Sequence, residues 1–307
     1  MHFADSFTLP GRWFKGSLHI HSTASDGKLG PDEVVAWYRS RGYHFLALTD
    51  HGVLSEARSF ARSGLADDFI TLSGIEVDGT DTQAGLYHLV GLGLNRPPNL
   101  YGKDLSMQEA ADRLRAAGGL VCLAHPYWSG QMSKDLLGLE GCFGLEVWNG
   151  GSEVDDAKGL SVVHWDDLLA AGRRLWGLAV DDAHWRNGSK DAGLGWVWVK
   201  APVLTQEAIL EALEHGYFYA SSGPQIHDLR LEGGQVWVRC SPALAVDFVG
   251  DGPLSRRITA PPGETLTEAT YRLDNRQRYV RVACQDPHGR WAWSNPILLD
   301  SRGPWRC

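Results

Sequence analysis

Residues 16–27 read GSLHIHSTASDG, an apolar stretch that gives way to a polar loop. Successive side chains of a β-strand point to opposite faces, so His19 and His21 share one face and can converge on one point. Asp26 follows in the loop, five positions after His21. The stretch predicts a strand over 16–22, and its two imidazoles alone are only a weak indication of a metal site.

Apolar runs of the same kind recur through the first two thirds of the chain. Further strands are predicted over 44–50, 69–77, 86–94, 119–126, 143–149 and 174–182. Helical segments lie between several of them, one opening on Pro31 and another with Ser106 as its cap. Buried strands separated by amphipathic helices indicate an α/β fold with a parallel sheet, most simply a barrel. An open doubly wound sheet is the alternative.

The pattern changes after a helix predicted over 205–216. From about residue 222 the chain alternates apolar and polar residues, as in QVWVRCS and RYVRVAC, with turn-rich pieces between and no amphipathic helix. This predicts an α/β domain over residues 1–222 and a small, all-β, sandwich-like domain over residues 223–307.

Composition and charge exclude several classes of protein. Apolar residues make up 43% and charged residues 21% of 307 residues, as in ordinary globular proteins. The absence of a long apolar run or a signal-like start predicts a cytoplasmic protein without a membrane partner. A net charge of -8 and the lack of a basic cluster predict that no nucleic-acid polymer is bound. Five scattered cysteines, without C-x-x-C spacing, predict reduced thiols. No pattern indicates an oligomeric state.

Potential metal ligands recur at or near the ends of the later predicted strands. They are His51 in LTDHG, Glu76 in SGIEVDG, His88 in LYHLV, His125 in LAHPYW, and Asp182 with His184 in LAVDDAH. In a parallel α/β barrel the carboxyl ends of all strands meet at one face, so these residues are expected to converge there.

The chemistry of this set predicts a polynuclear metal centre. With His19, His21 and Asp26, the set has six imidazoles, three carboxylates and no thiolate, which suits Zn, Mn or Fe. Nine ligands exceed what one ion takes, so we expect two or three divalent ions, with Glu76 bridging a pair. Such a centre indicates hydrolysis.

Some nearby residues have more ordinary explanations. His88 is equally consistent with a hydrogen-bonded strand residue, because apolar residues follow it. Asp50 and Asp181 each precede a better-placed candidate, and we expect them to hold loops or orient ligands. The remaining histidines have no predicted convergent partner; they are His44, His164, His215, His227 and His288.

The motifs together resemble the polymerase and histidinol phosphatase (PHP) superfamily of metallohydrolases. HIHSTASDG, LTDHG, LAHP and VDDAH are similar to its successive motifs, over about the first 220 residues. GCFGLEVWNG, YASSGP and WAWSNPIL further resemble the branch that includes carbaryl hydrolase, in which a β-rich domain follows.

The resemblance implies a distorted seven-stranded β/α barrel with up to three metal ions. It places His19, His21, Glu76 and Asp182 on the first ion. Glu76 would bridge to a second ion held by His88 and His125, while Asp26, His51 and His184 would bind the third.

Several residues beside the motifs are candidate substrate contacts. An aromatic or nucleoside group could stack on tryptophans near strand ends, and cationic side chains could hold a phosphate. The candidates are Lys28, Tyr127, Trp128, Trp148, Asn149, Trp185 and Arg186. Because the chain has 13 Trp, any one of them is as consistent with core packing as with a pocket.

The favoured function is a phosphoesterase that cleaves a small phosphomonoester or phosphodiester. A hydroxide bridging two ions would attack phosphorus, with catalytic roles assigned to Asp26, Glu76, Asp182 and His184. An ester, carbamate or amide hydrolase acting on a neutral aromatic substrate is the alternative. A noncatalytic, metal-stabilised binding module is disfavoured, because a structural centre needs no open coordination position.

Overall fold

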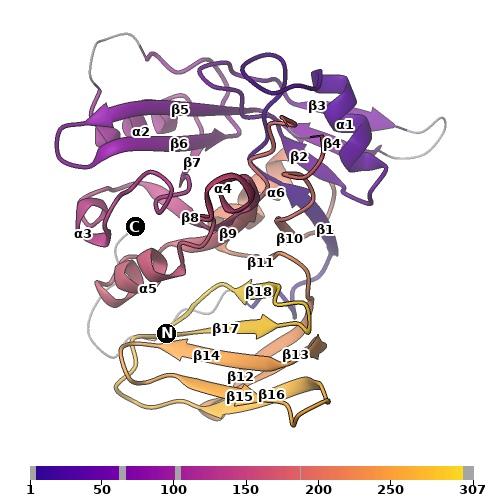
Figure 1. Cartoon of the computed structure of the whole chain (residues 1–307), viewed down its shortest axis with the longest axis vertical. Helices are drawn as coiled ribbons and strands as arrows, with labels where there is room; N and C mark the ends of the chain where they lie inside the picture. Colours follow the sequence, from indigo (N-terminus) through magenta and orange to yellow (C-terminus); the bar gives the residue numbers. More distant parts are fainter. Residues whose placement is uncertain (1–4, 62–66, 101–104, 187, 300–307) are drawn as a thin grey trace.

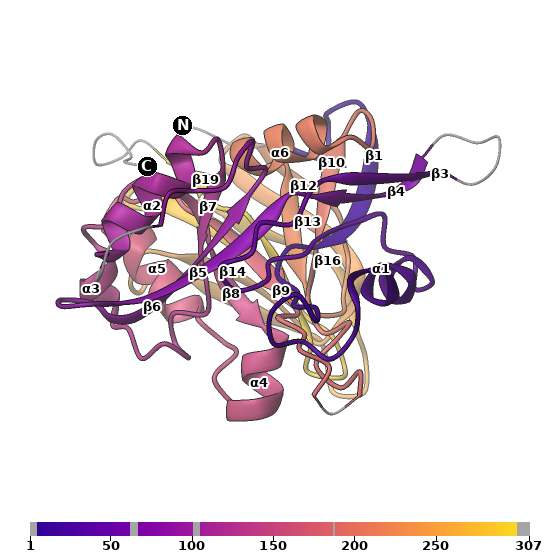
Figure 2. The same ribbon diagram turned by 90° about the horizontal axis from the view of Figure 1, so that it is seen from above.

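The computed structural model describes residues 5–61, 67–100, 105–186 and 188–299. Its helices are α1 (Pro31–Arg39), α2 (Met107–Ala116), α3 (Ser133–Leu136), α4 (Gly150–Asp156), α5 (Val162–Ala170) and α6 (Gln206–His215). Among these residues no helix is both long and apolar enough to cross a membrane. Figure 2 shows α1 on one side of the central strands, with α2, α3 and α5 on the other.

The strands form one long sheet and two smaller ones. The long sheet runs in the order β15 (Arg256–Thr259), β14 (Ala245–Gly250), β17 (Tyr279–Gln285), β18 (Trp291–Ser294), β11 (Phe218–Ser221), β10 (Trp196–Ala201), β1 (Arg12–Ser17), β2 (Phe45–Ala47), β4 (Asp67–Leu72), β3 (Arg58–Ala61), with β19 (Ile297–Leu298) on β17. The second contains β5 (Gly74–Asp81), β6 (Gly85–Leu92), β7 (Leu120–Leu123), β8 (Cys142–Asn149) and β9 (Trp176–Val180). The third contains β12 (Ile226–Glu232), β13 (Gln235–Ala243) and β16 (Leu266–Arg272).

Strand β1 is shorter and lies earlier than predicted, so the two histidines follow it. The chain stays extended beyond Ser17, because His21 N–H donates to the Ala183 carbonyl at 3.0 Å and the His19 carbonyl accepts from Asp182 N–H at 2.8 Å. Ile20 and Ala183 form an isolated parallel bridge there. A second bridge joins His51 to Glu76, so both edges of the five-stranded sheet meet the long sheet beside the histidines.

The strand predicted over 69–77 is two strands that belong to different sheets. The chain breaks at Ser73, whose backbone N–H donates to Gln206 Oε1 at 2.8 Å and whose hydroxyl donates to the Leu94 carbonyl at 2.9 Å. These contacts turn the chain from β4 into β5. The α/β fold is therefore built from more strands than the sequence pattern indicates.

The expectation of a parallel sheet is wrong for β5, β6 and β7. β5 pairs with β6 and β6 with β7 in antiparallel fashion, whereas β7, β8 and β9 are parallel. The cause of the first antiparallel pair is a tight turn: Asp81 Oδ1 accepts from Gln83 N–H at 2.7 Å and Ala84 N–H at 3.1 Å. Gly85 then takes a positive φ of 72°. Such a short connection permits only antiparallel pairing.

The C-terminal part is β-rich, as predicted. Residues 223–299 contain strands and no helix, and many of their apolar side chains form a buried cluster around Phe248 and Val282. That region lies at the bottom of Figure 1, below the α/β part. The long sheet nevertheless continues across residue 222, because β18 pairs with β11.

Candidate metal centre

Four predicted ligands meet in a buried group between the two joined sheets. His19 Nε2 lies 3.2 Å from Glu76 Oε2 and 3.2 Å from Asp182 Oδ1. His21 Nε2 lies 3.1 Å and 3.0 Å from the same two oxygens. All four residues are buried, and their ligand atoms lie within 4.8 Å of one another. Chain segments far apart in sequence thus converge as expected.

Glu76 faces the other histidines with its two oxygens. Its Oε1 lies 2.8 Å from His88 Nδ1 and 3.3 Å from His125 Nε2. Its Oε2, which faces His19 and His21, also lies 3.3 Å from His51 Nδ1. His51, Glu76 and His88 form a second cluster of possible ligands. A single buried carboxylate is thus in reach of five imidazoles.

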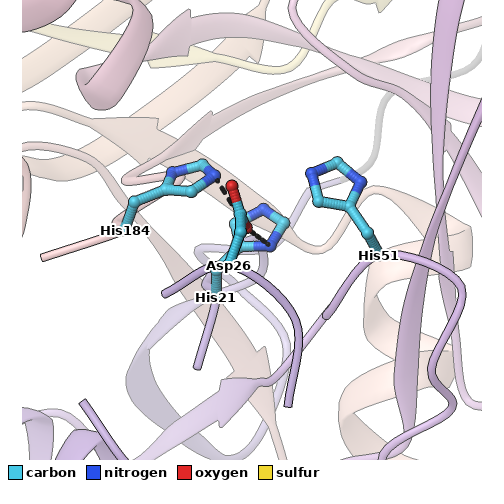
Figure 3. A group of neighbouring side chains, drawn as sticks. All are labelled: His21, Asp26, His51 and His184. Carbon is cyan, nitrogen blue, oxygen red and sulfur yellow. Dashed lines mark ion pairs between the residues drawn. The ribbon is translucent and has the colours of Figure 1, made fainter. Parts of the chain in front are cut away.

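A third cluster lies nearer the surface, drawn in Figure 3. His184 Nε2 is 3.4 Å from Asp26 Oδ1, and His21 Nδ1 is 3.7 Å from the same oxygen. His51 completes the cluster. His21 therefore borders two clusters, where the resemblance placed it in one.

Buried polar atoms with no hydrogen-bond partner mark the middle of these clusters. Among the described residues they include Glu76 Oε2, Asp182 Oδ1 and His51 Nδ1. Carboxylate and imidazole atoms at about 3 Å without aligned hydrogen bonds are the arrangement expected of groups that face a shared cation. With hard oxygen and borderline nitrogen donors, the set could hold divalent metal ions.

The pKa shifts of the buried group also indicate a site that favours positive charge. Burial lowers the pKa of His19 and of His21, but the carboxylates of Asp182 and Glu76 outweigh it. The pKa of His19 is thus well above its usual range, and that of His21 is raised to about 9. Burial opposes ionisation of Glu76 and Asp182 as well, yet the imidazoles hold the pKa of both well below the usual range. The group retains positive charge between its carboxylates.

The metal-free protein is therefore expected to lose stability as the pH rises from about 6.5 to about 9. A histidine whose pKa is higher in the folded than in the unfolded chain stabilises the fold fully at pH values below its unfolded pKa of ~6.5. This stabilisation is lost as the pH rises through the pKa of the folded chain. Thermal unfolding of chelator-treated protein across this range measures the effect. A flat or rising Tm would contradict the charge assignment, and His21→Ala should flatten the curve.

Three of the four non-glycine residues with positive φ in the described chain lie at this site. They are His125 at 25°, Asp182 at 53° and Trp185 at 64°, with Ala157 elsewhere. Side chains other than glycine rarely adopt this conformation, and where it occurs it clusters at functional sites.

A family model agrees with the site. The model of the PHP domain matches residues 17–113, which include six of the nine predicted ligands. Residues 17–113 of the chain are thus similar to the PHP domain. A protein from Bacteroides vulgatus, described as a two-domain protein containing a predicted PHP-like metal-dependent phosphoesterase, has the same fold with a TM-score of 0.51. It is 16% identical, over 95% of this chain and 97% of its own.

Two curated relatives match part of the chain. A 3',5'-nucleoside bisphosphate phosphatase of Chromobacterium violaceum is 34% identical over 144 residues, or 45% of this chain and 44% of its own. A 5'-3' exoribonuclease of Haemophilus influenzae is 34% identical over 104 residues, or 33% of this chain and 37% of its own. The chain thus spans less than half the length of either relative.

Asp50 and Asp181 hold loops beside the site, as expected. Asp50 accepts from the backbone N–H and hydroxyl of Ser22, both at 2.8 Å, and from those of Ser25 at 3.1 and 2.7 Å. Asp181 accepts from Tyr38 at 2.6 Å and from two backbone N–H groups of the 194–195 segment. Both carboxylates are occupied by donors, so they shape the loops that carry the ligands.

A cavity of about 140 Å³ opens onto the clusters. Trp128 lines it, with its ring 5.4 Å from that of His88 and 5.0 Å from that of His125. Arg186 lines it too and forms an ion pair with Asp26. Asp155 and Asp156, which the sequence did not single out, lie on the wall provided by α4.

Two of the tryptophans predicted as substrate contacts, Trp185 and Trp148, pack away from the cavity. Trp185 is buried against Trp37 and Tyr38, and its indole N–H donates to the His21 carbonyl at 3.2 Å. Trp148 donates to the Leu194 carbonyl at 3.1 Å and stacks on Trp293. They were selected by nearness in sequence, which does not fix the direction of a side chain.

Tyr127 and Lys28 lie at the surface. Tyr127 is 45% exposed, and its ring lies beside His164 and Lys158. Lys28 is also exposed, and its backbone N–H donates to the His184 carbonyl at 2.9 Å. The other predicted contact, Asn149, is buried among carboxylates.

Residues expected to lie apart from the site include several histidines and the cysteines. His44 accepts from Lys15 N–H, while His164 and His215 hydrogen-bond to backbone carbonyls. Cys122, Cys142, Cys240 and Cys284 are buried free thiols, and Cys307 lies outside the described residues.

Sequence reasoning missed Glu146, a buried carboxylate in the middle of β8. Its Oε1 lies 2.7 Å from His19 Nδ1, the ring nitrogen that faces away from Glu76 and Asp182. A carboxylate within an otherwise apolar strand was the available signal, because a buried Glu needs a partner.

Proposed function

We propose that the chain is a metal-dependent phosphoesterase that cleaves a small phosphomonoester or phosphodiester. The observation that carries the proposal is Glu76, buried and in reach of five imidazoles beside a cavity that opens to solvent. The two curated relatives, a phosphatase and an exoribonuclease, both act on phosphate esters, which supports the proposal.

Two of the three proposed ligand sets follow the clusters, and the second rests on the contacts of Glu76 Oε1. His19, His21, Glu76 and Asp182 would hold one ion, and Glu76 with His88 and His125 a second. Asp26, His51 and His184 would hold a third, with His21 beside them. Two or three divalent ions, Zn, Mn or Fe, suit these donors.

Ions bound there would activate water and neutralise charge on the phosphoryl oxygens. The chain's own groups would bind and orient the ester. Arg186, paired with Asp26, places a guanidinium on the cavity wall, where it can hold a phosphoryl oxygen. Trp128 offers a flat apolar face to the leaving group. With only two ions bound, His184 and Asp26, which are 3.4 Å apart at the mouth, could instead pass a proton to the departing oxygen.

An ester, carbamate or amide hydrolase is the second candidate, favoured by the carboxylates of Asp155 and Asp156 on the cavity wall. They would repel a multiply charged anion more than a neutral substrate. The similarity to the carbaryl hydrolase branch stays a prediction, as does the expectation that no nucleic-acid polymer is bound.

We also propose the architecture that the resemblance implies. Strands β1, β2 and β5–β9 would form the seven-stranded barrel, which the bridges Ile20–Ala183 and His51–Glu76 support by closing the ring. Residues 1–222 would be the catalytic domain and residues 223–307 the β-rich domain. The separate buried cluster of the C-terminal part supports that division.

The function is tested by loading the purified protein with Mn²⁺, Zn²⁺ or Fe²⁺ and assaying aryl phosphomonoesters, aryl phosphodiesters, a short oligoribonucleotide, aryl acetates and aryl carbamates. Turnover of phosphate esters that is lost in His19→Ala is expected. Rapid carbamate or acetate hydrolysis without phosphate-ester turnover would replace the proposal with the second candidate.

Asp26→Ala is expected to remove one metal ion and leave the others. Asp26 belongs to the outer cluster, while Glu76 and Asp182 hold the buried one. Metal analysis of protein dialysed against a slight excess of metal measures the loss, with the exposed Asp112→Ala as control. If Asp26→Ala loses every ion, the clusters are not separate sites.

A further inference from the structure

Glu146 connects several proposed ligands through hydrogen bonds of its own. Its Oε1 lies 2.7 Å from His19 Nδ1, and its Oε2 accepts from the backbone N–H of His125 at 2.9 Å. The side-chain amide of Asn149 donates to the same Oε2 at 2.8 Å and to Asp182 Oδ2 at 3.1 Å. One buried carboxylate thus reaches two proposed ligands directly and a third through an amide.

The orientation of the Asn149 amide is fixed independently. Its Oδ1 accepts from Ser152 N–H at 2.8 Å, at the start of α4, so its NH₂ group must face the two carboxylates. Both hydrogens of that group are then used, one on Glu146 and one on Asp182. Asn149 is 1% exposed and therefore holds the ligands in place from behind the site.

A β-bulge is what turns both side chains toward the site. Residues three apart on a regular strand point to opposite faces, yet Glu146 and Asn149 share one. The register of β8 on β9 shifts between Glu146 and Trp148, which inserts one residue and reverses the alternation. The bulge therefore places Glu146 and Asn149 together beside the proposed metal centre.

We propose that Glu146, oriented by Asn149, is a positioning residue for the metal centre, an inference that rests on the proposed function. His19 Nε2 faces Glu76 and Asp182, so it can bind a metal only with its lone pair free. The ring proton must then sit on Nδ1 and be donated to Glu146. Glu146 fixes the tautomer and angle of His19 and the positions of His125 and Asp182.

Glu146 is not itself a ligand in this proposal, although it lies in a cluster with His19 and His125. Both of its oxygens already accept hydrogen bonds from groups of the chain. A positioning residue and a metal ligand differ in what their substitution does to the number of ions bound.

Glu146→Gln tests the proposal because it keeps the shape and removes one acceptor. If the new NH₂ faces His19, the ring proton must move to Nε2 and block the lone pair. If it faces the other way, it opposes the N–H groups of His125 and Asn149. Either arrangement should weaken the affinity for at least one ion about 10–100-fold, while saturating metal restores the wild-type number of ions.

The measurements are titration with Zn²⁺ against a chromophoric chelator, metal counting at saturation, and the visible absorption spectrum of the Co²⁺ form. The exposed Glu140→Gln, which should match the wild type, is the control. Unchanged affinity and an unchanged Co²⁺ spectrum in Glu146→Gln would overturn the proposal. Loss of a whole ion at saturation would overturn it too, and would identify Glu146 as a ligand.

If Glu146→Gln does not fold, Asn149→Ala tests the same positioning role. It should lower metal affinity by a smaller factor and reduce kcat more than it raises KM. A raised KM with unchanged metal affinity would instead make Asn149 a substrate contact. Should wild-type protein bind metal, and Glu146→Gln weaken that binding, while no phosphate ester is cleaved, the proposed function fails and the positioning role stands.

Discussion

Glu76→Gln is expected to lower kcat/KM for a phosphate ester by roughly 10³-fold or more. Its carboxylate is buried and is the group that two of the three proposed ions would share. A metal's stabilisation of transition-state charge is worth several kcal/mol, and each 1.36 kcal/mol is tenfold in rate. An amide keeps the size of Glu76 but removes its charge, so metal binding and activity should fall together.

The control is Asp78→Asn, on the same strand. Asp78 lies 3.2 Å from His51 and its side chain is 55% exposed, so its loss should change kcat/KM less than tenfold. Steady-state kinetics are compared with metal content for wild type and both variants. A Glu76→Gln protein with normal metal content and activity within tenfold of wild type would refute the central role of Glu76.

Removing the metal should abolish phosphate-ester turnover and lower the Tm by about 5–10 °C for each tightly bound ion. A ligand that binds only the folded chain, at 100 times its Kd, stabilises it by about 2.7 kcal/mol, and 1 kcal/mol is worth about 2–4 °C in domains of this size. The clustered carboxylates and imidazoles are the source of this dependence. Chelation followed by thermal unfolding and an activity assay measures both effects.

Two comparisons separate the effect of metal loss on Tm and activity from nonspecific effects of the chelator. Returning Zn²⁺ or Mn²⁺ should restore both the Tm and the activity of wild type. Glu76→Gln, already short of metal, should show a much smaller Tm change on chelation. An unchanged wild-type Tm after complete metal loss would mean that the clusters are stable without ions.

The sequence predicted the convergence of the ligands but not every strand that carries them. His19 and Asp182 lie just beyond the ends of β1 and β9, and that position is visible in the apolar pattern. Glu76 joins them from within β5, close to the break after β4 that the pattern does not show. The direction of β6 is set by the turn at Asp81, which the apolar pattern of β5 and β6 does not report. Periodicity finds strands, whereas pairing depends on connections between them.

The site beyond the ligands was harder to predict. Glu146 and Asn149 act on one face only because of a bulge in β8, which simple alternation excludes. Trp128 and Trp185 are equally close to a motif, yet one lines the cavity and the other packs into the core. Those outcomes depend on loop geometry and on tertiary packing.

The β5–β6 hairpin carries two of the proposed ligands, and this links metal binding to the folding of the sheet. Glu76 pairs with Val90, and His88 pairs with Asp78, so both ligands project from the same face. A slip of the two strands by one residue would turn one ligand to the opposite face. Metal would then bind only chains in which β5 and β6 pair in the correct register. Metal binding would thus stabilise that register over the slipped one.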